Sequence, residues 1–299
     1  GMDPIELRRK NYIRRGEGSP VFKAMGEGRE GVEQVITSSG LFEGIEKGLA
    51  AIGWYGKKKL YKDQKGPKRR GLGCACLMQG SGIAEVDMGA ASIKMNEDGS
   101  FNLLVGAADL GTGSDTVLAQ IAAEVLGVTE ADIIVTSSDT DLTPFDVGAY
   151  ASSTTYISGN AAKKAALHAR EQIAQVAAKI LDEKPEDIRL EGGKAVGKSG
   201  RACALSEVAN TSLYYHDQHQ IIGTASHYSK SSPPPFAAHF AEVEVDTETG
   251  LVRVVDYVAA VDCGTAINPS LAEGQNDGAV LNGISYALTE EMEFGPGGA

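Results

Sequence analysis

Three stretches of the sequence place small, hydroxyl-bearing or amide side chains at the start of a predicted helix, where they can bind an anion or another polar ligand. The first, residues 106–116, is rich in glycine and contains three hydroxyl side chains; the second, residues 139–155, ends in Ser152, Ser153 and Thr154. The third, residues 262–275, ends at Gln275. Free backbone N–H groups and the helix dipole make helix N-termini good anion sites. Taken alone, each stretch is also explained as an ordinary strand-to-helix turn, and for residues 262–275 that interpretation is the favoured one.

The residues around these stretches predict the elements that position them. Alternating apolar residues on either side of the turns at residues 96–99 and 247–250 predict two β-hairpins. Each hairpin is followed by a glycine-containing loop and a helix, over residues 115–126 and 271–288. In the second helix, Ser270 and Glu273 have the spacing of a capping box, which predicts a start at Ser270. After the second stretch, an Ala-rich helix is expected from the Ser158–Asn160 region to Leu181.

The chain is predicted to be an α/β (α+β) protein with two related hairpin–loop–helix subdomains, mixed sheets and flanking helices. Residues 1–70 are expected to form a helical, basic linker segment, with helices over residues 4–11, 31–40 and 41–52 and a connector over residues 54–70. Residues 71–221 are the first predicted subdomain and residues 222–299 the second. Duplicated α/β units commonly enclose ligands between them.

The charge distribution is uneven. Residues 1–70 contain 16 basic and 9 acidic residues, whereas the remainder contains 12 and 31, within a net charge of −12. The basic groups at residues 57–59 and 68–70 are typical of a nucleic-acid patch or of an arm that docks on an acidic surface. Because the rest of the chain would repel a phosphate backbone, docking is favoured and nucleic acid is not an expected partner.

Several functional classes lack their sequence signals. No apolar stretch reaches the ~20 residues that cross a bilayer, so a membrane role is not expected. The four cysteines are too few and scattered for a disulfide framework, which indicates reduced thiols and a cytoplasmic location. The histidines lack metal-ligand spacing, no nucleophile elbow is present, and no catalytic or metal-binding residue is assigned.

Taken in order, the three loops resemble the molybdenum-cofactor-binding large subunit of the xanthine dehydrogenase and aldehyde oxidase family, the molybdenum hydroxylases. Residues 3–11 resemble the family's linker helix, residues 106–127 its Gly-Gln-Gly pterin loop and helix, and residues 151–161 its serine-rich loop. Residues 242–250 and 262–275 resemble its last cofactor segment. The matches span nearly the whole chain.

This resemblance implies a bound molybdopterin cofactor, as the mononucleotide or the cytosine dinucleotide. Gly111, Thr112 and Gly113 would lie against the pterin, and Gln275 would hydrogen-bond it. Ser152, Ser153 and Thr154 would hold the pyrophosphate or nucleotide end. The implied reaction is hydroxylation of an aldehyde or N-heterocycle carbon with oxygen derived from water. Electrons would leave through iron–sulfur clusters and FAD on partner domains or subunits.

The sequence also departs from the family pattern. Thr112 stands where the family usually has glutamine, and the family's glycine-rich upstream loops and its downstream Gly-x-Gly-Glu segment, which carries the catalytic base, do not occur here. We therefore expect a fragment that is inactive alone. The alternative is a non-catalytic scaffold that retains the fold and docks partners through its basic arm. The substrate and the oligomeric state, including a homo-oligomer, stay open.

Overall fold

The structure is a computed structural model that describes residues 1–26, 28–215 and 217–298. Its contacts divide the chain into two compact units, each assembled from segments far apart in the sequence. Unit 1 contains Gly1–Ser19, Gln34–Gln79 and the residues from Pro233 onward; unit 2 contains Pro20–Glu33 and Gly80–Ser232. This division reflects which segments contact one another most densely, and it does not test the subdomains expected at residues 71–221 and 222–299, which stay a prediction.

Unit 2 is built on a four-stranded sheet in the order β4–β3–β2–β8. The strands are β2 (Met88–Met95), β3 (Phe101–Val105), β4 (Ile133–Ser137) and β8 (Ile222–Tyr228). β2 pairs antiparallel with β3 and β8, whereas β3 and β4 are parallel. Every second residue of β2 and β3 is buried, so one face of the sheet forms the core and the other is partly exposed.

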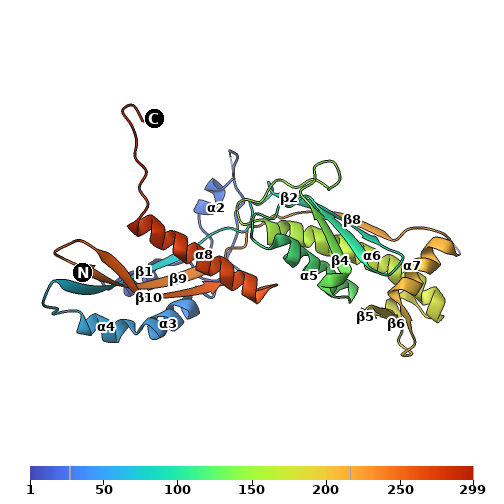
Figure 1. Cartoon of the computed structure of the whole chain (residues 1–299), viewed down its shortest axis with the longest axis horizontal. Helices are drawn as coiled ribbons and strands as arrows, with labels where there is room; N and C mark the ends of the chain where they lie inside the picture. The colour runs from blue at the N-terminus through green and yellow to red at the C-terminus, as the bar shows by residue number, and fades with distance from the viewer. Residues whose placement is uncertain (27, 216, 299) are drawn as a thin grey trace. The chain divides into compact units, whose positions relative to one another are not determined.

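Two helices cover the buried face of this sheet, α5 (Ser114–Leu126) and α6 (Thr154–Leu181) (Figure 1). α5 is the crossover between the parallel strands β3 and β4. The small buried residues of α6 let its backbone approach closely: a Cβ added at Gly223 of β8 would lie 2.0 Å from the carbonyl oxygen of Ala165. The remaining elements of unit 2 are α2 (Val21–Ala24), η1 (Glu130–Asp132), η2 (Pro185–Asp187), β5 (Arg189–Glu191), β6 (Lys194–Val196), β7 (Ala202–Ala204) and α7 (Leu205–Tyr214).

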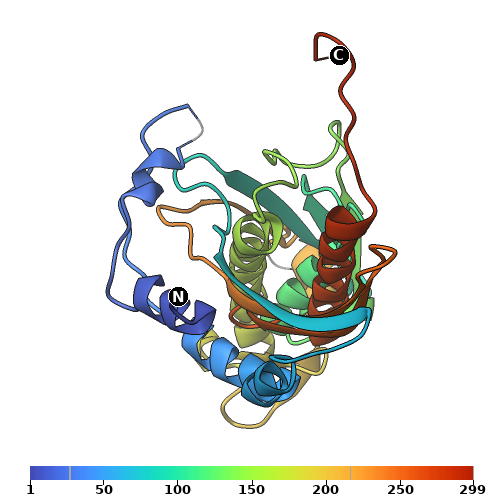
Figure 2. The same ribbon diagram turned by 90° about the vertical axis from the view of Figure 1, so that its left-hand side faces the viewer.

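Unit 1 is built on a three-stranded antiparallel sheet, β1–β9–β10. The strands are β1 (Lys68–Met78), β9 (Phe236–Asp246) and β10 (Val252–Asp262). Helices α3 (Leu41–Ile52) and α4 (Trp54–Leu60) lie on one side of the sheet and α8 (Pro269–Leu288) on the other (Figure 2). Trp54 and Phe240 meet edge to face at 6.0 Å between ring centroids, in a core next to Gly48. Helix α1 (Pro4–Asn11) completes the unit.

The predicted fold class is confirmed, and so is the plan of hairpin, loop and helix. β2–β3–α5 and β9–β10–α8 are the two copies. Four details are wrong. Residues 31–40 form no helix, and the expected connector contains α4. The Ser158–Asn160 region lies inside α6, which begins at Thr154. Finally, the N-cap of α8 is Asn268 and not Ser270, so the helix begins at Pro269. The side chain of Asn268 accepts a hydrogen bond from Leu271 N at 3.1 Å.

Candidate functional site

The glycine-rich loop between β3 and α5 is folded around its own carboxylate. Asp109 Oδ1 accepts hydrogen bonds from the backbone N–H groups of Gly111 at 2.8 Å and Gly113 at 3.2 Å, and Oδ2 accepts one from Asp115 at 3.3 Å. Gly111 and Gly113 have φ of +91° and +76°, which L-residues rarely adopt. Thr112 lies between them and is exposed. The loop therefore presents the Thr112 side chain outward, while its glycine amides point to Asp109.

Asp109 is a charged group at neutral pH. Burial raises the pKa of its carboxyl, but hydrogen bonds from the surrounding backbone amides outweigh burial and hold that pKa below its ordinary value. The backbone amides of Gly111 and Gly113, which a glycine-rich loop could offer to an external anion, are thus already bound to Asp109. The spacing Asp-x-Gly is the signal that predicts such a turn, and the sequence reasoning did not use it.

Two polar atoms at the first turn of α5 are buried without a partner among the described residues. They are Ser114 Oγ and Asp115 Oδ1. Ser114 is only 5% exposed, and the other oxygen of Asp115 accepts a hydrogen bond from Ser137 Oγ at 3.1 Å. A buried hydroxyl or carboxylate oxygen without a partner is costly, so such atoms commonly mark a place where a ligand or water completes the bonding. The hydroxyl of Ser114 can donate a hydrogen bond and Asp115 Oδ1 can accept one.

The serine-rich stretch before α6 has a strained backbone. Ala151 and Ser152 both adopt left-handed conformations, with φ of +50° and +55°. Ser152 is exposed and Ser153 is buried, with its N–H and Oγ bound to the carbonyl oxygen of Tyr150 at 3.0 and 2.8 Å. Thr154 is the first residue of α6. Left-handed non-glycine residues cost about 1–3 kcal/mol each and concentrate at functional sites.

These two stretches lie at the same end of unit 2. A Cβ added at Gly159 in the second turn of α6 would lie 2.9 Å from Ile121 Cδ1 in the middle of α5, so the two helices touch there. At their other ends both helices meet the small β5–β6–β7 sheet: Gly127 O accepts a hydrogen bond from Gly193 N at 2.9 Å, and Asp182 O accepts one from Arg201 at 3.4 Å. The helices are therefore parallel, and both positive ends open beside the candidate loops.

The third stretch belongs to unit 1. Asp262, at the end of β10, accepts hydrogen bonds from the backbone N–H of Gly264 at 3.0 Å and of Gly40, before α3, at 2.6 Å. Gln275 lies in the second turn of α8 and is exposed. Gln275 is thus on a different unit from the other candidate residues. Its role, like theirs, stays a prediction.

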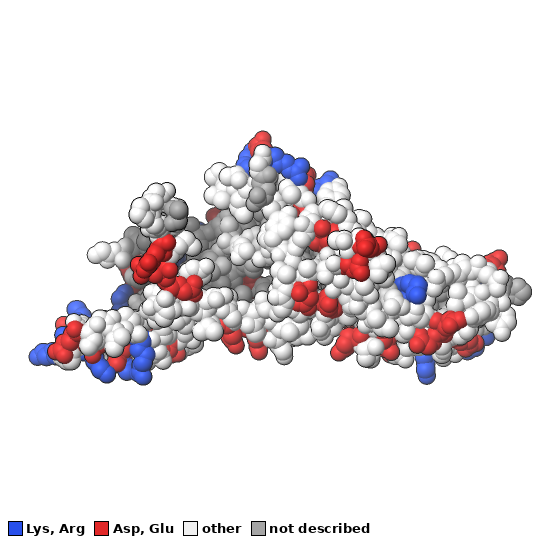
Figure 3. All heavy atoms as spheres, turned by 45° about the horizontal axis from the view of Figure 1, so that its top comes forward, with Lys and Arg blue, Asp and Glu red and all other residues white. Residues whose placement is uncertain are grey.

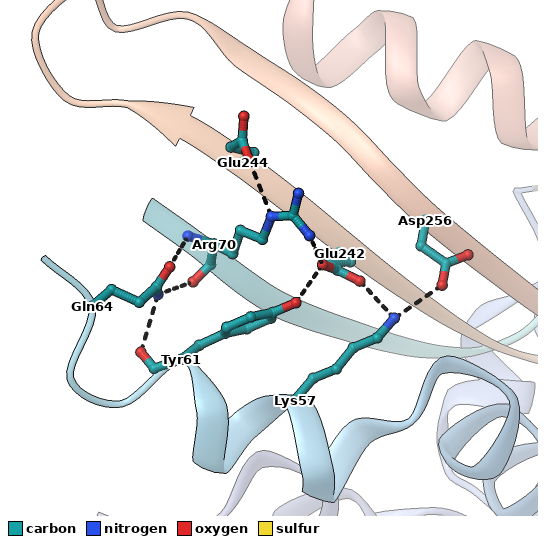
Figure 4. Close-up of polar contacts among 7 residues, drawn as sticks. All are labelled: Lys57, Tyr61, Gln64, Arg70, Glu242, Glu244 and Asp256. Carbon is teal, nitrogen blue, oxygen red and sulfur yellow. Dashed lines mark hydrogen bonds and ion pairs between the residues drawn. The ribbon is translucent and has the colours of Figure 1, made fainter. Parts of the chain in front are cut away.

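The basic arm docks on its own unit, as the sequence indicated. Glu242 is 2% exposed and accepts hydrogen bonds from Lys57 at 2.6 Å, Tyr61 at 2.6 Å and Arg70 at 3.3 Å (Figure 4). Lys57 also pairs with Asp256 at 3.0 Å. Further pairs join Lys58 to Asp3, Lys68 to Glu244 and Arg70 to Glu244. Glu242, in the segment that resembles the last cofactor loop, therefore holds α4 to the sheet.

The surface and the metal-binding side chains add little to these candidates. On the face drawn in Figure 3, basic side chains occur in small groups interspersed with acidic ones. Among the described residues, no group of three His, Cys, Asp or Glu is placed to hold a metal ion. In the same part of the chain, no helix has the length and apolar character needed to cross a bilayer.

Comparison with known proteins identifies the family. Residues 47–299 match the family model of the molybdopterin cofactor-binding domain, and this range includes every candidate residue above. The chain belongs to this family, whose domain occurs in the molybdenum-cofactor-binding large subunits of the molybdenum hydroxylases.

Individual relatives agree with this assignment. The chain is 38% identical over 295 residues to a probable hypoxanthine oxidase of Escherichia coli K12, covering 98% of this chain and 30% of the relative. It is 34% identical over 299 residues to a putative xanthine dehydrogenase molybdenum-binding subunit of the same organism, covering 98% and 38%. The crystal structure of quinoline 2-oxidoreductase from Pseudomonas putida 86 matches with a TM-score of 0.88 and 25% identity, over 99% of this chain and 39% of that one. The chain thus spans about a third of the length of these proteins.

Proposed function

We propose that this chain supplies part of the molybdopterin site of a molybdenum hydroxylase, and that Gly111–Gly113 and Ser152–Thr154 contact the cofactor. The observation that carries the proposal is that both loops precede the N-termini of two parallel helices, α5 and α6, at the same end of unit 2. There, the hydroxyl of Ser114 and one oxygen of Asp115 are buried and have no hydrogen-bond partner within the described part of the chain. The family match supports the same ligand.

The residues present fit the cofactor in a definite division of roles. Ser114 would donate to an oxygen of the cofactor and Asp115 would accept from one of its N–H groups. The positive ends of α5 and α6 would favour its phosphate groups. Thr112 would replace the usual glutamine at the pterin, and Gln275 would add a hydrogen bond from α8. Asp109 would keep the glycine loop in its binding conformation by holding its amides.

The reaction proposed for the assembled enzyme is hydroxylation of an aldehyde or N-heterocycle carbon. When bound, the cofactor supplies two-electron oxidation with oxygen derived from water. The names of the relatives, among them a hypoxanthine oxidase and a molybdenum-binding subunit, favour a heterocyclic substrate and partner subunits. We propose that these partners carry iron–sulfur clusters and FAD, and that the cofactor is the mononucleotide or the cytosine dinucleotide. The contribution of this chain is to bind and orient the cofactor.

The substitution Ser114→Ala tests the proposal because it predicts two effects of opposite sign. Removing a buried hydroxyl that has no partner in the residues that the structure describes leaves the cofactor-free chain as stable as before or more stable, by up to about 1 kcal/mol. In the native complex, the same change removes a donor to the cofactor, and we expect its retention to weaken about tenfold. Molybdenum and pterin content and the thermal midpoint of unfolding are the measurements.

Ser212→Ala is the matched control for this experiment. Ser212 is equally buried in unit 2, but its Oγ donates to the carbonyl oxygen of Ala209 at 2.9 Å. Its loss should lower stability and leave the cofactor content unchanged. A Ser114→Ala variant that loses stability and keeps its cofactor would contradict the proposed role of this loop.

A further inference from the structure

The loop that precedes α6 contains two residues in a strained backbone conformation, which persists only where surrounding contacts hold it. Ala151 and Ser152 are consecutive left-handed residues, and neither is glycine. The flanking residues are fixed: Ser153 is bonded to Tyr150 O through both its N–H and its hydroxyl. A contact outside the loop must therefore hold Tyr150 for the left-handed turn to persist.

That contact is made by Asp87, which lies 63 residues before Tyr150 in the sequence. Asp87 is 0% exposed, so its charge has to be satisfied by neighbouring donors. Its Oδ1 accepts a hydrogen bond from the hydroxyl of Tyr150 at 3.0 Å, and its Oδ2 accepts one from the backbone N–H of Ile83 at 2.7 Å. The Tyr150 hydroxyl is thus one of the donors that satisfy this buried carboxylate.

The turn around Gly82 completes the connection to the strained residues. The backbone N–H of Gly82 donates to the carbonyl oxygen of Ala151 at 2.8 Å. A Cβ added at Gly82 would lie 3.2 Å from Asp87 Oδ2 and 3.5 Å from Ser153 Cβ, and its φ is +78°. Its carbonyl oxygen accepts a hydrogen bond from Ser232 Oγ at 2.6 Å. Residues 82–87 are therefore fixed by hydrogen bonds and in turn bind the backbone of Ala151.

We propose that Asp87 is a positioning residue: through Tyr150 it holds Ala151 and Ser152 in the left-handed turn that presents the serine-rich loop to the phosphate end of the cofactor. This inference rests on the proposed function of that loop. Asp87 itself is buried and acts only through Tyr150 and the Gly82 turn. Asp87 thereby sets the population of the binding-competent conformation of the loop. The apparent affinity for a ligand falls in proportion to that population.

Tyr150→Phe in the full chain is the direct test, because it removes the hydroxyl and keeps the ring, which is 44% exposed. Amide hydrogen exchange of residues 148–153 without ligand should become about tenfold faster, the effect of losing a hydrogen bond to a charged group. The affinity for inorganic pyrophosphate, measured by calorimetry, should fall by a similar factor. The thermal midpoint of the chain should fall by only a few degrees, and amides elsewhere in unit 2 that exchange by local opening should keep their rates, which separates positioning of the loop from loosening of the whole unit.

Two further variants make the result specific. Tyr214→Phe removes another tyrosine hydroxyl that donates to a carboxylate in unit 2, that of Glu97, and should change neither exchange of the loop nor pyrophosphate binding. Adding Ala151→Gly to Tyr150→Phe should recover at least about fivefold of the lost affinity and protection, because glycine adopts the left-handed conformation without strain.

The outcomes distinguish this inference from the proposed function. If the unmodified chain does not bind pyrophosphate but Tyr150→Phe still loosens residues 148–153 alone, the positioning contact stands and the assigned ligand of the loop is wrong. If the unmodified chain binds pyrophosphate and Tyr150→Phe changes neither exchange nor affinity, Asp87 does not position the loop. Equal loosening of the whole unit would likewise overturn the inference.

Discussion

Single carboxylates organise this chain both within a loop and between distant segments, and each is satisfied in a different way. Asp109 is held by backbone amides of its own loop, whereas Glu242 is held by Lys57 and Tyr61, more than 180 residues away. The sequence indicated that the basic arm would dock on acidic groups, because the charges are segregated. It gave no sign of which residues would pair, since such pairs depend on the register of β1 against β9.

Glu242→Gln should lower the free energy of unfolding by about 2 kcal/mol at pH 7, because the amide has one acceptor where Lys57 and Tyr61 need two. Burial raises the pKa of Glu242, but its hydrogen bonds with Lys57 and Tyr61 outweigh burial and lower it below the ordinary value. The contribution is therefore complete above the ordinary glutamate pKa, ~4.3, and is lost as pH falls through the lower folded-state pKa. Urea unfolding at several pH values measures it.

Glu43→Gln is the control for this prediction. Glu43 pairs with Lys47 on the exposed surface of α3, so its loss should cost less than about 0.5 kcal/mol. An effect of Glu242→Gln no larger than that of Glu43→Gln would show that the buried network does not hold α4 to the sheet.

At the scale of elements, local patterns predicted the hairpins and most helices, since alternation and turn residues act over a few positions. The start of a helix depends on which of several nearby side chains acts as its N-cap. Ser270 and Glu273 have capping-box spacing, but Asn268 followed by Pro269 caps α8 two residues earlier. The tie from Asp87 to Tyr150 could not be predicted, because a buried aspartate gives no local signal of a partner 63 residues away.

The packing of α3 and α4 against the sheet of unit 1 gives an element-scale prediction. A Cβ added at Gly48 would lie 2.1 Å from Phe240 Cε2, so Gly48→Ala should destabilise unit 1 by about 1–3 kcal/mol through overpacking. Gly56 in α4 has open space at the same position, and Gly56→Ala should be neutral or stabilising by up to about 1 kcal/mol. Chemical denaturation of both variants measures the difference; equal effects would contradict the close contact of α3 with Phe240.

At the scale of the whole molecule, the chain is two units, each closed by pairing between segments far apart in the sequence. Unit 1 requires β1 to pair with β9, with Lys68 opposite Asp246. The candidate residues are divided accordingly, with Gly111–Gly113 and Ser152–Thr154 on unit 2 and Gln275 on unit 1. The order of the loops along the chain predicted the family, because that order can be read without knowing which strands pair. The assignment of residues to units required the structure.

The most direct test of the central claim is the molybdenum and pterin content of the native protein, purified with the subunits that accompany it. Elemental analysis and the fluorescence of the released, oxidised pterin give the two amounts independently. The account predicts about one molybdenum and one pterin per copy of this chain. A pure, folded native complex that contains neither would contradict it.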